Sequence, residues 1–578
     1  MQKNAFFIVS MVAILLLGTI AYFNTLDGDW VWDDVSSVLL HRHVQDPGQF
    51  TQLFKEDQHA FGRGQGNFYR PLVAASFMLD FWLSHDPVRD SNPDLPYPDV
   101  STLLFHISNL LWHLAAAVLL CLLLHRFGAP RFVSFTVPLI FVVHPLHTEA
   151  VAYISGRADM MSGVFIFLGL YFGLWEGSQR KRIAGIILSS LAFILGLLSK
   201  ESTLIFPLLL GLCIFLLPIA RNGESEGPVS RKALLKQRAL PLAPALIIVL
   251  IYGYLRSTVL HFADTTTAME AAPFLTRLVE VVQAFALYIR LLFIPTGLHM
   301  ERSLDHVGLI TALIGLVVLA MLIGLLVWAV RGGHNRIAIG LGWFFLAWLP
   351  ISGLFPLNAP MAEHWMYVPM AGFWWAMAEL LYAHLPHSYT WRRGKAVLVG
   401  ALCLLFILLT VQRNEDWKSN ERLFRATLAQ NPNTIRVHHN LAVTYEDLEG
   451  NFSGARRHWE HILALYREDK VANNLTPDYL LPEEIEVYHS LGKIHFQQQN
   501  HAEARDTLAF LLNAALQPER REMLGRFRGE IASAAMLYGK AALAMGDVGE
   551  AEMSFRQAQN LAPELESEVE TILLGAPL

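Results

Sequence analysis

The sequence predicts an all-α protein in which a polytopic membrane domain is followed by a soluble domain of helical repeats. Of the 578 residues, 53% are hydrophobic and 16% are charged, which is too apolar for a soluble protein of this length. Long apolar runs stop near residue 411, and a degenerate helical repeat fills the rest of the chain. These observations predict a membrane domain at residues 1–411 and a soluble domain at residues 412–578.

About eleven apolar segments of the membrane domain are long enough to cross a bilayer. The first follows Lys3 and resembles a signal sequence. Its apolar core is long enough to span, however, and no clear cleavage site of small residues follows it, so we expect an uncleaved helix. The expected spans are residues 5–23, 102–124, 131–147, 158–176, 183–199, 202–219, 239–256, 308–330, 337–355, 365–383 and 395–411.

One further apolar segment, residues 274–297, is expected to lie in the membrane interface or to re-enter the membrane. It carries Arg277, Glu280 and Arg290, and an arginine at the centre of the bilayer costs several kcal/mol. If this segment spanned the membrane instead, the soluble domain would lie on the cytoplasmic side.

The basic residues predict the orientation of the membrane domain. With a cytoplasmic N-terminus, the inner loops contain the basic sequences QRKR, RNGESEGPVSRKALLKQR and WRRGK. The short outer loops near Arg157, Lys200 and Glu363 carry almost no basic residues. An excess of Lys and Arg marks cytoplasmic loops, so we expect the soluble domain outside the cytoplasm.

A long outer loop, residues 24–101, begins with the acidic pair Asp33 and Asp34. Neighbouring carboxylates repel each other, which raises one of the two pKa values and keeps a proton acceptor available near neutral pH. A transferase needs such a base to deprotonate an acceptor hydroxyl. Two alternatives stay open: the pair ligates a divalent cation, or it caps the following helix. The loop ends in the amphipathic run NFYRPLVAASFMLDFWL, which we expect along the membrane surface.

A second polar segment, HPLHTEAVAYISGRAD, covers residues 144–159. His144, His147 and Glu149 are metal-ligand types, but a spacing of three and then two residues on a turn is not a zinc signature. Arg157 and Lys200, one helix apart, offer cationic donors for a phosphate.

The alternative is that these cations only form local ion pairs, Arg157 with Asp159 and Lys200 with Glu201. A third polar group, Glu363, His364 and Tyr367, enters the helix that follows it, and its alternative is an interfacial aromatic belt with a capping acid. Because the acidic pair and these groups all fall at outer helix ends, we expect them to share a site.

The soluble domain carries a degenerate tetratricopeptide repeat. Its clearest copy, AAMLYGKAALAMGDVGEAEMSFRQAQNLAP, has small residues, an aromatic residue and a proline at the repeat positions Gly539, Ala551, Phe555, Ala558 and Pro563. Earlier copies contain Ala455 and Ala504, with loops inserted between copies. Such helix pairs stack into a concave surface suited to partner proteins; the alternative is a spacer that only stabilises the membrane domain.

The segments WVWDD, YRPL, HPLHTEAVAYISGRAD, LSKES, LLFIPTGLHMERS and AEHWMYVPMAGF occur in this order before the repeats. In this combination they resemble the transmembrane and tetratricopeptide-repeat O-mannosyltransferases, a branch of the GT-C glycosyltransferases. The resemblance covers essentially the whole chain. Fewer repeats than in the larger eukaryotic members, and the absence of their cysteines, fit a compact member of a bacterial inner membrane with periplasmic repeats.

The resemblance implies transfer of a sugar, typically mannose, from a polyprenyl-phosphate carrier to a protein Ser or Thr hydroxyl on the noncytoplasmic face. The reaction is expected to invert the configuration at the anomeric carbon of the sugar. The acidic pair is the catalytic element of such enzymes, so Asp33 is expected to accept the hydroxyl proton, with Asp34 supporting Asp33 or the acceptor.

The carrier phosphate is the leaving group, so nearby cations are expected to stabilise its growing charge. The residues expected to bind the donor phosphate or the sugar are Arg157, Lys200, Glu149, His144, Arg256, Arg290, Glu363 and His364. Tyr69 and Arg70 are expected to bind the acceptor or to support the loop. The metal requirement stays open, because GT-C enzymes differ in metal dependence; a divalent cation is the one cofactor considered.

Other functions stay open as well. One alternative is a catalytically inactive membrane scaffold whose repeats recruit periplasmic partners. Another is a transporter of a lipid-linked saccharide. The chain can also be a transferase with another sugar or with a glycan or lipid acceptor. The net charge of −6 gives no support to nucleic-acid binding, which needs a clustered basic surface.

Overall fold

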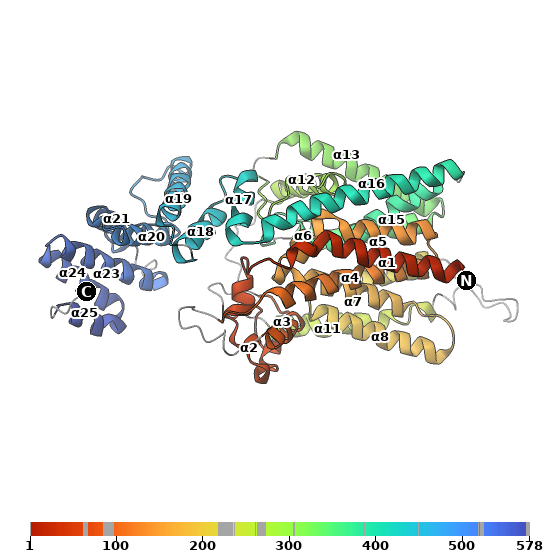
Figure 1. Ribbon diagram of the computed structural model, residues 1–578, viewed down its shortest axis with the longest axis horizontal. Coiled ribbons are helices and arrows are strands. Elements are labelled where there is room, and N and C mark those ends of the chain that lie inside the picture. The colour runs from red at the N-terminus through yellow and green to blue at the C-terminus, as the bar shows by residue number, and fades with distance from the viewer. Residues whose placement is uncertain are drawn as a thin grey trace. The chain divides into compact units, whose positions relative to one another are not determined.

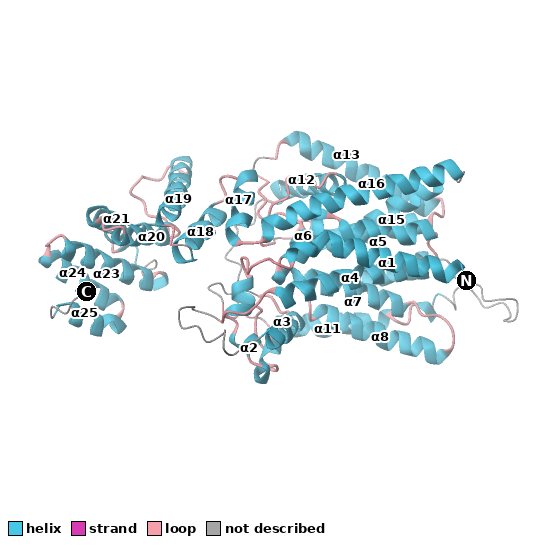
Figure 2. Cartoon of the chain, in the orientation of Figure 1, coloured by secondary structure: helices cyan, strands magenta, loops and turns pink. Residues whose placement is uncertain are grey.

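The part of the chain that the structure, a computed structural model, describes is helical throughout and contains no strand (Figures 1 and 2). The described residues are 2–61, 67–84, 98–217, 235, 237–260, 262, 273–304, 307–355, 357–384, 386, 388–448, 450–517, 520 and 525–573. They form two compact units, Met1–Leu423 and Phe424–Leu578. The predicted all-α fold class is confirmed.

The first unit is a bundle of long helices in which α1, α4, α5 and α16 pack against one another (Figure 1). Short one-turn helices lie between them, several in the outer loop. The helices are α1 (Gln2–Tyr22), α2 (Arg42–Gln45), α3 (Pro71–Ser84), α4 (Leu103–Arg126), α5 (Arg131–Val143), α6 (Thr148–Ala152), α7 (Arg157–Gly173), α8 (Gln179–Leu197), α9 (Phe206–Leu216), α11 (Leu242–Thr258), α12 (Phe274–Phe293), α13 (Leu309–Arg331), α14 (Asn335–Trp348), α15 (Tyr367–His384) and α16 (Tyr389–Asn414). The boundary between the units falls within α17 (Asn420–Gln430).

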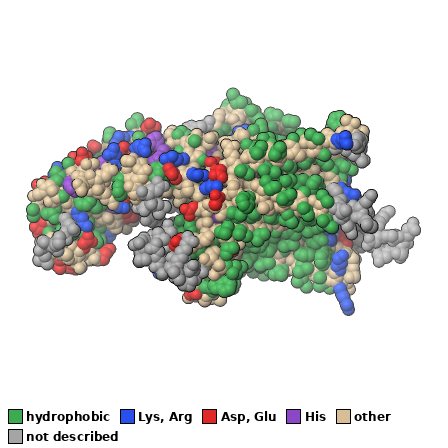
Figure 3. Space-filling view, in the orientation of Figure 1, with side chains coloured by type: hydrophobic (Ala, Val, Ile, Leu, Met, Phe, Trp, Pro, Cys, Tyr) green, Lys and Arg blue, Asp and Glu red, His purple; other side chains and the backbone are tan. Residues whose placement is uncertain are grey.

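Each of the expected spans contains a helix of this unit. By length and composition, four helices of the described residues are able to cross a membrane alone, and a fifth crossing is formed if α5 and the bent segment after it are counted together. Broad areas of hydrophobic side chains cover the helices of this unit, and charged side chains gather at its ends (Figure 3). Leu250, Ile310 and Val397 are each more than 70% exposed. Such a surface is typical of a membrane protein.

The helices α14 and α15 lie unusually close together, because each presents a glycine to the other. A Cβ atom on Gly340 would lie 2.7 Å from the backbone nitrogen of Ala376, and one on Gly372 would lie 2.6 Å from the carbonyl oxygen of Gly340. Small residues that let helix backbones approach are characteristic of helix packing in membranes.

The helix α12 has polar contacts with segments at the expected outer ends of other helices. Arg277 Nη1 donates to the carbonyl of Leu354, and Gln283 Nε2 donates to the carbonyl of Val307 at 2.6 Å. Tyr288, near the other end of α12, donates its hydroxyl to the carbonyl of Ala362 at 3.1 Å.

A break between α5 and α6 positions the segment 144–159. The chain bends by 53° between Arg131–Val143 and Pro145–Ala152, where Pro145 stops the helix by lacking an N–H. The segment then continues through Ile154–Gly156, a single 3-10 turn, into α7. It is almost completely buried.

The second unit consists of antiparallel helix pairs, as expected for tetratricopeptide repeats. Gly539 packs directly against the ring of Phe555, because a Cβ atom there would lie 2.6 Å from the ring; Gly492 packs in the same way against Leu508. Ala551 and Ala558 are buried as predicted. The helices are α18 (Ile435–Val443), α19 (Phe452–Ala472), α20 (Glu484–Gln497), α21 (His501–Ala515), α23 (Arg528–Ala544), α24 (Val548–Leu561) and α25 (Glu566–Leu573).

Candidate active site

The backbone adopts an uncommon conformation at Trp32, immediately before the acidic pair. Its φ of 51° lies in the left-handed region, which residues other than glycine seldom adopt. The N–H of Trp32 donates to Asn420 Oδ1 at 2.8 Å, and its ring stacks on Tyr153 with 6.2 Å between centroids. These contacts hold a strained residue in place. They therefore fix the backbone position of Asp33 and Asp34, which follow it.

Asp34 is fully buried and links the outer loop to the segment 144–159. Its Oδ1 accepts hydrogen bonds from the N–H and the hydroxyl of Ser155, at 2.8 and 2.7 Å, and its Oδ2 accepts from the N–H of Val31 at 3.1 Å. Burial outweighs these bonds and raises the pKa of Asp34 from 3.8 to about 7. The Asp34 carboxyl therefore connects the outer loop to the segment 144–159 and holds the two together.

Asp33 is half-buried, and its surroundings are polar. Its side chain is hydrogen-bonded to Tyr153, and its charge acts on the nearby ring of His59. The backbone carbonyl of Asp33 accepts from the N–H of Ser37 at 2.9 Å and from the hydroxyl of Ser36 at 3.0 Å. Asp33 is therefore the more exposed member of the pair.

The structure brings together the acidic pair, the segment 144–159, Lys200 and the group at Glu363 and His364, which were expected to share a site. The segment 144–159 contacts each of the other three: Ser155 bonds Asp34, Asp159 pairs with Lys200, and Glu149 pairs with His364. The Oδ1 atom of Asp159 lies 2.6 Å from Lys200 Nζ. Glu149 Oε1 lies 2.7 Å from His364 Nδ1, and Glu149 Oε2 accepts from the N–H of His364 at 3.0 Å.

Arg157 is completely buried, and its guanidinium is taken up by groups of the protein. Nη1 lies 2.6 Å from Asp80 Oδ2, and Nε donates to Asn109 Oδ1 at 2.7 Å. Nη1 also donates to the hydroxyl of Ser76, and Nη2 donates to the carbonyl of Phe105. The ion pair expected as an alternative, with Asp159, is not formed, because Asp159 is held by Lys200.

Arg256 and Tyr69 support the outer loop. Arg256 Nη2 donates to the carbonyl and to the side-chain oxygen of Asn67, at 2.8 and 3.0 Å. Tyr69 donates its hydroxyl to the carbonyl of Phe54 at 3.2 Å.

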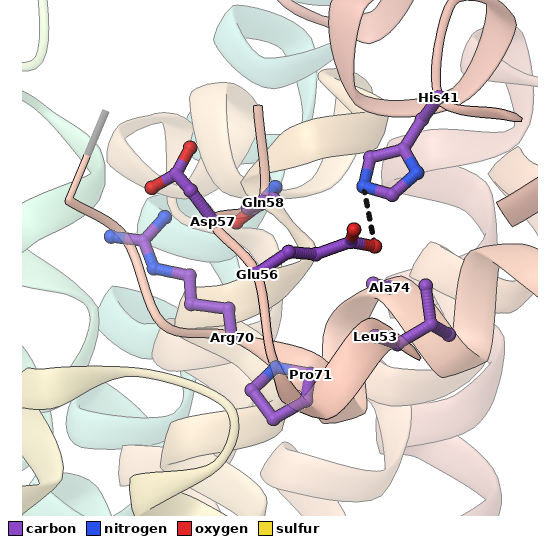
Figure 4. A pocket seen from close by; sticks show the side chains of 8 residues that line it. All are labelled: His41, Leu53, Glu56, Asp57, Gln58, Arg70, Pro71 and Ala74. Carbon is purple, nitrogen blue, oxygen red and sulfur yellow. Dashed lines mark ion pairs between the residues drawn. The ribbon is translucent and has the colours of Figure 1, made fainter. Parts of the chain in front are cut away.

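Arg70 borders a small recess in the same loop, shown in Figure 4. Its guanidinium pairs with Glu201 at 3.3 Å, so Glu201 is not the partner of Lys200. Across the recess, His41 Nε2 lies 3.7 Å from Glu56 Oε1, and Glu56 Oε2 lies 2.7 Å from His43 Nδ1. The recess is lined by polar groups, but it is too small for a sugar.

His144 caps the start of the segment 144–159. Its Nδ1 accepts from the N–H of Leu146 at 3.2 Å, so its Nε2 donates to the carbonyl of Leu292 at 3.0 Å. Both ring nitrogens are thus in use. Among the residues that the structure describes, no group of three or more His, Cys, Asp or Glu side chains is arranged to hold a metal ion.

Glu363 is fully buried between two arginines. Its Oε1 accepts from Arg302 Nη2 at 2.8 Å and from the N–H of His299 at 2.6 Å, and its Oε2 lies 3.5 Å from Arg413 Nη2. Arg290 lies nearby but is exposed, and it donates to the carbonyl of Thr296 at 3.2 Å.

Tyr153, Arg302 and Arg413 were not among the residues expected from the sequence. The first two stand inside segments that carry the resemblance, HPLHTEAVAYISGRAD and LLFIPTGLHMERS, whereas Arg413 stands at the end of the last apolar helix. A signal was therefore present for two of the three. Their association depends on contacts between helices far apart in the chain.

Comparisons with known proteins identify relatives of this chain. The tetratricopeptide repeat family model matches residues 532–565. The protein O-mannosyl-transferase TMTC4 of Homo sapiens is 27% identical, over 77% of this chain and 65% of the relative. The protein O-mannosyl-transferase F38B6.6 of Caenorhabditis elegans is 24% identical, over 78% and 62%, and TMTC3 of Mus musculus is 24% identical, over 89% and 55%.

The chain thus spans between 55% and 65% of the length of these relatives. No solved structure matches it. The predicted resemblance to the transmembrane and tetratricopeptide-repeat O-mannosyltransferases is confirmed.

Proposed function

We propose, from its relationship to the protein O-mannosyl-transferases, that this chain is a membrane glycosyltransferase with a protein acceptor. It moves a sugar, mannose in the simplest case, from a polyprenyl-phosphate carrier to a Ser or Thr hydroxyl on the noncytoplasmic face. The observation that carries this proposal is the place of Asp33: a half-buried carboxylate on a strained turn, at the junction of four polar segments.

In this proposal Asp33 is the general base. The acceptor oxygen attacks C1 of the sugar, the bond between C1 and the phosphate oxygen breaks with its electron pair leaving on the phosphate, and Asp33 takes the hydroxyl proton. A single displacement inverts the configuration at C1 and needs no covalent enzyme intermediate. Asp34 positions Asp33 through its bonds to Ser155 and Val31.

The other candidate residues divide into two groups. Arg157, Lys200, Arg256, His144 and Glu149 are engaged by protein groups, so we assign them positioning roles around the donor. Glu363, His364 and Arg290 lie on the side of the site where we place the donor, and Tyr69 and Arg70 support the loop that meets the acceptor. We also propose that the repeats bind the acceptor protein.

The second candidate function is a membrane scaffold without transferase activity. The match to the tetratricopeptide repeat family supports the protein binding that such a scaffold needs. One experiment separates the two. Membranes containing equal amounts of wild type, Asp33→Asn or Asp46→Asn are given radiolabelled polyprenyl-phosphate-mannose, and label in endogenous proteins is measured. Asp46 is an exposed carboxylate of the same loop and serves as the matched control.

We expect wild type and Asp46→Asn to transfer label, and Asp33→Asn to lose about a hundredfold or more in rate, the usual contribution of a general base. Equal transfer by Asp33→Asn would exclude Asp33 as the base. No transfer by wild type, with the protein folded and the donor intact, would favour the scaffold.

A further inference from the structure

Two buried arginines, Arg302 and Arg413, face a buried carboxylate. Their exposed fractions are 8% and 5%, and Glu363 between them is fully buried. Asp416 bonds Arg413 Nη1 at 2.8 Å, but its own side chain is 36% exposed. The buried carboxylate of Glu149 also interacts electrostatically with Arg413, so acidic groups of the protein surround both guanidinium groups.

This centre also has hydrogen-bond donors that are not used. The Nε atoms of Arg302 and Arg413 and the indole Nε1 of Trp417 are buried without a hydrogen-bond partner among the described residues, whereas Arg413 Nη2 faces Glu363 Oε2 at 3.5 Å. Trp417 is 1% exposed. A buried donor without a partner costs about 1–3 kcal/mol, and more when it is charged, so several such donors in one place indicate a ligand that accepts hydrogen bonds.

Two aromatic rings, those of Trp417 and Tyr153, lie between Arg413 and Asp33. The guanidinium carbon of Arg413 lies 5.7 Å from the centre of the Trp417 ring. The ring of Trp417 lies 5.3 Å from the ring of Tyr153, and Tyr153 is hydrogen-bonded to Asp33. Two contacting aromatic rings therefore connect Arg413 with the proposed base.

We infer that Arg302, Arg413 and the indole N–H of Trp417 bind the phosphate of the lipid-linked sugar. This assignment rests on the proposed function and gives the donor a phosphate site other than Arg157 and Lys200. A phosphate oxygen accepts from guanidinium and indole N–H groups. When the bond between C1 and the phosphate oxygen breaks, the same donors stabilise the negative charge that grows on that oxygen.

Binding of the carrier lipid, measured without transfer, tests this site. Full-length protein in lipid nanodiscs is titrated with a C55 polyprenyl phosphate, with the matching polyprenol, and with inorganic phosphate. The variants are Arg413→Gln, Arg302→Gln and Trp417→Phe, which keeps the ring and loses only the N–H. Arg422→Gln is the matched control, because Arg422 is 57% exposed and pairs with Glu415 at 2.9 Å.

We expect polyprenyl phosphate to bind wild type and Arg422→Gln equally. The arginine variants should bind it about tenfold or more weakly, because each loses charge-assisted hydrogen bonds, and Trp417→Phe should lose less. Arg413→Lys, which keeps the charge, should recover part of the affinity. The polyprenol should bind all variants alike.

Several results would overturn the assignment. Unchanged affinity in folded Arg413→Gln, Arg302→Gln and Trp417→Phe would remove the site while leaving the proposed function intact. An equal, arginine-dependent affinity for inorganic phosphate would assign the site to free phosphate instead. Failure of the proposed function has a different signature: wild type binds the lipid phosphate through these residues but transfers no sugar.

Discussion

Asp33 and Asp34 are neighbours in the sequence, yet their surroundings give them different physical characters. Asp34 is sealed inside the protein and accepts three hydrogen bonds, whereas Asp33 keeps part of its side chain open. Two adjacent carboxyl groups with different environments commonly divide the tasks of support and proton transfer. The strained backbone of Trp32, directly before them, sets the direction in which each side chain points.

The stability of the protein should depend on pH through Asp34. Burial raises its pKa from 3.8 to about 7, so the folded protein binds this proton more tightly than the unfolded chain does. The contribution of Asp34 to the free energy of unfolding is therefore largest below pH 4 and is lost as the pH rises through 7. Each pKa unit corresponds to about 1.4 kcal/mol, so the contribution of Asp34 to the free energy of unfolding is at most about 4 kcal/mol.

Asp34→Asn removes this titration and keeps an oxygen for Ser155. We expect the Tm of the variant, relative to that of wild type, to increase between pH 5 and pH 8 in detergent solution. The Tm difference for Asp46→Asn should stay constant over the same range. A constant difference for Asp34→Asn would contradict a raised pKa for Asp34.

At the scale of single elements, the contact between α14 and α15 depends on the absence of side chains at Gly340 and Gly372. The atoms that a new side chain at Gly340 would meet are backbone atoms of α15, which cannot move aside without displacing the helix. Both helices contribute residues to the core of the first unit. Their spacing therefore affects the polar loop at the outer end of α15.

Gly340→Leu should separate α14 from α15 and destabilise the first unit by about 1–3 kcal/mol, the usual cost of overpacking. The measurement is the Tm of the detergent-solubilised protein, followed by size-exclusion chromatography after heating. Gly324→Leu on α13 is the control, because a Cβ atom at Gly324 meets nothing within 4 Å. An equal loss of stability in both variants would show that close packing at Gly340 is not the cause.

At the scale of the whole molecule, the orientation in the membrane decides whether the site meets its substrates. The polar contacts of α12 with Leu354, Val307 and Ala362 support our proposal that it lies in the interface at the outer ends of other helices. With α12 there, the number of spans is odd, and the two ends of the membrane domain lie on opposite sides.

Reporter fusions test this topology. A reporter that is active only outside the cytoplasm should work when it is fused after Gly450, and it should be inactive when fused after Gly333, in a basic loop that we expect inside. Activity at Gly333 together with inactivity at Gly450 would show that α12 spans the membrane or that the whole domain has the reverse orientation. Activity at both positions would show that α14, α15 or α16 does not cross the membrane, because these three helices separate the two positions.

The sequence predicts well what neighbouring residues determine. The apolar segments and the repeat positions Gly539 and Phe555 are local patterns, and the structure contains a helix or a close contact at each. The acidic pair stands out because two carboxylates after the first apolar segment are unusual.

The partners of the charged residues cannot be predicted in the same way. Arg157 pairs with Asp80, and Arg302 and Arg413 share Glu363. These pairs join segments that are far apart in the chain, so only the packed bundle determines them. A charge considered alone gives no indication of whether a protein group already neutralises it, and this information separates a positioning arginine from one that is available to a ligand.

The hydrogen bond from Trp32 to Asn420 has a consequence for biosynthesis. Trp32 and the acidic pair leave the ribosome early, whereas Asn420 follows the last apolar helix. During translation the proposed base is therefore present long before the residue that fixes its turn. A nascent chain, or one truncated within the membrane domain, has the carboxylates without this contact, so the proposed transfer site is completed only after the last helix of the bundle has been inserted.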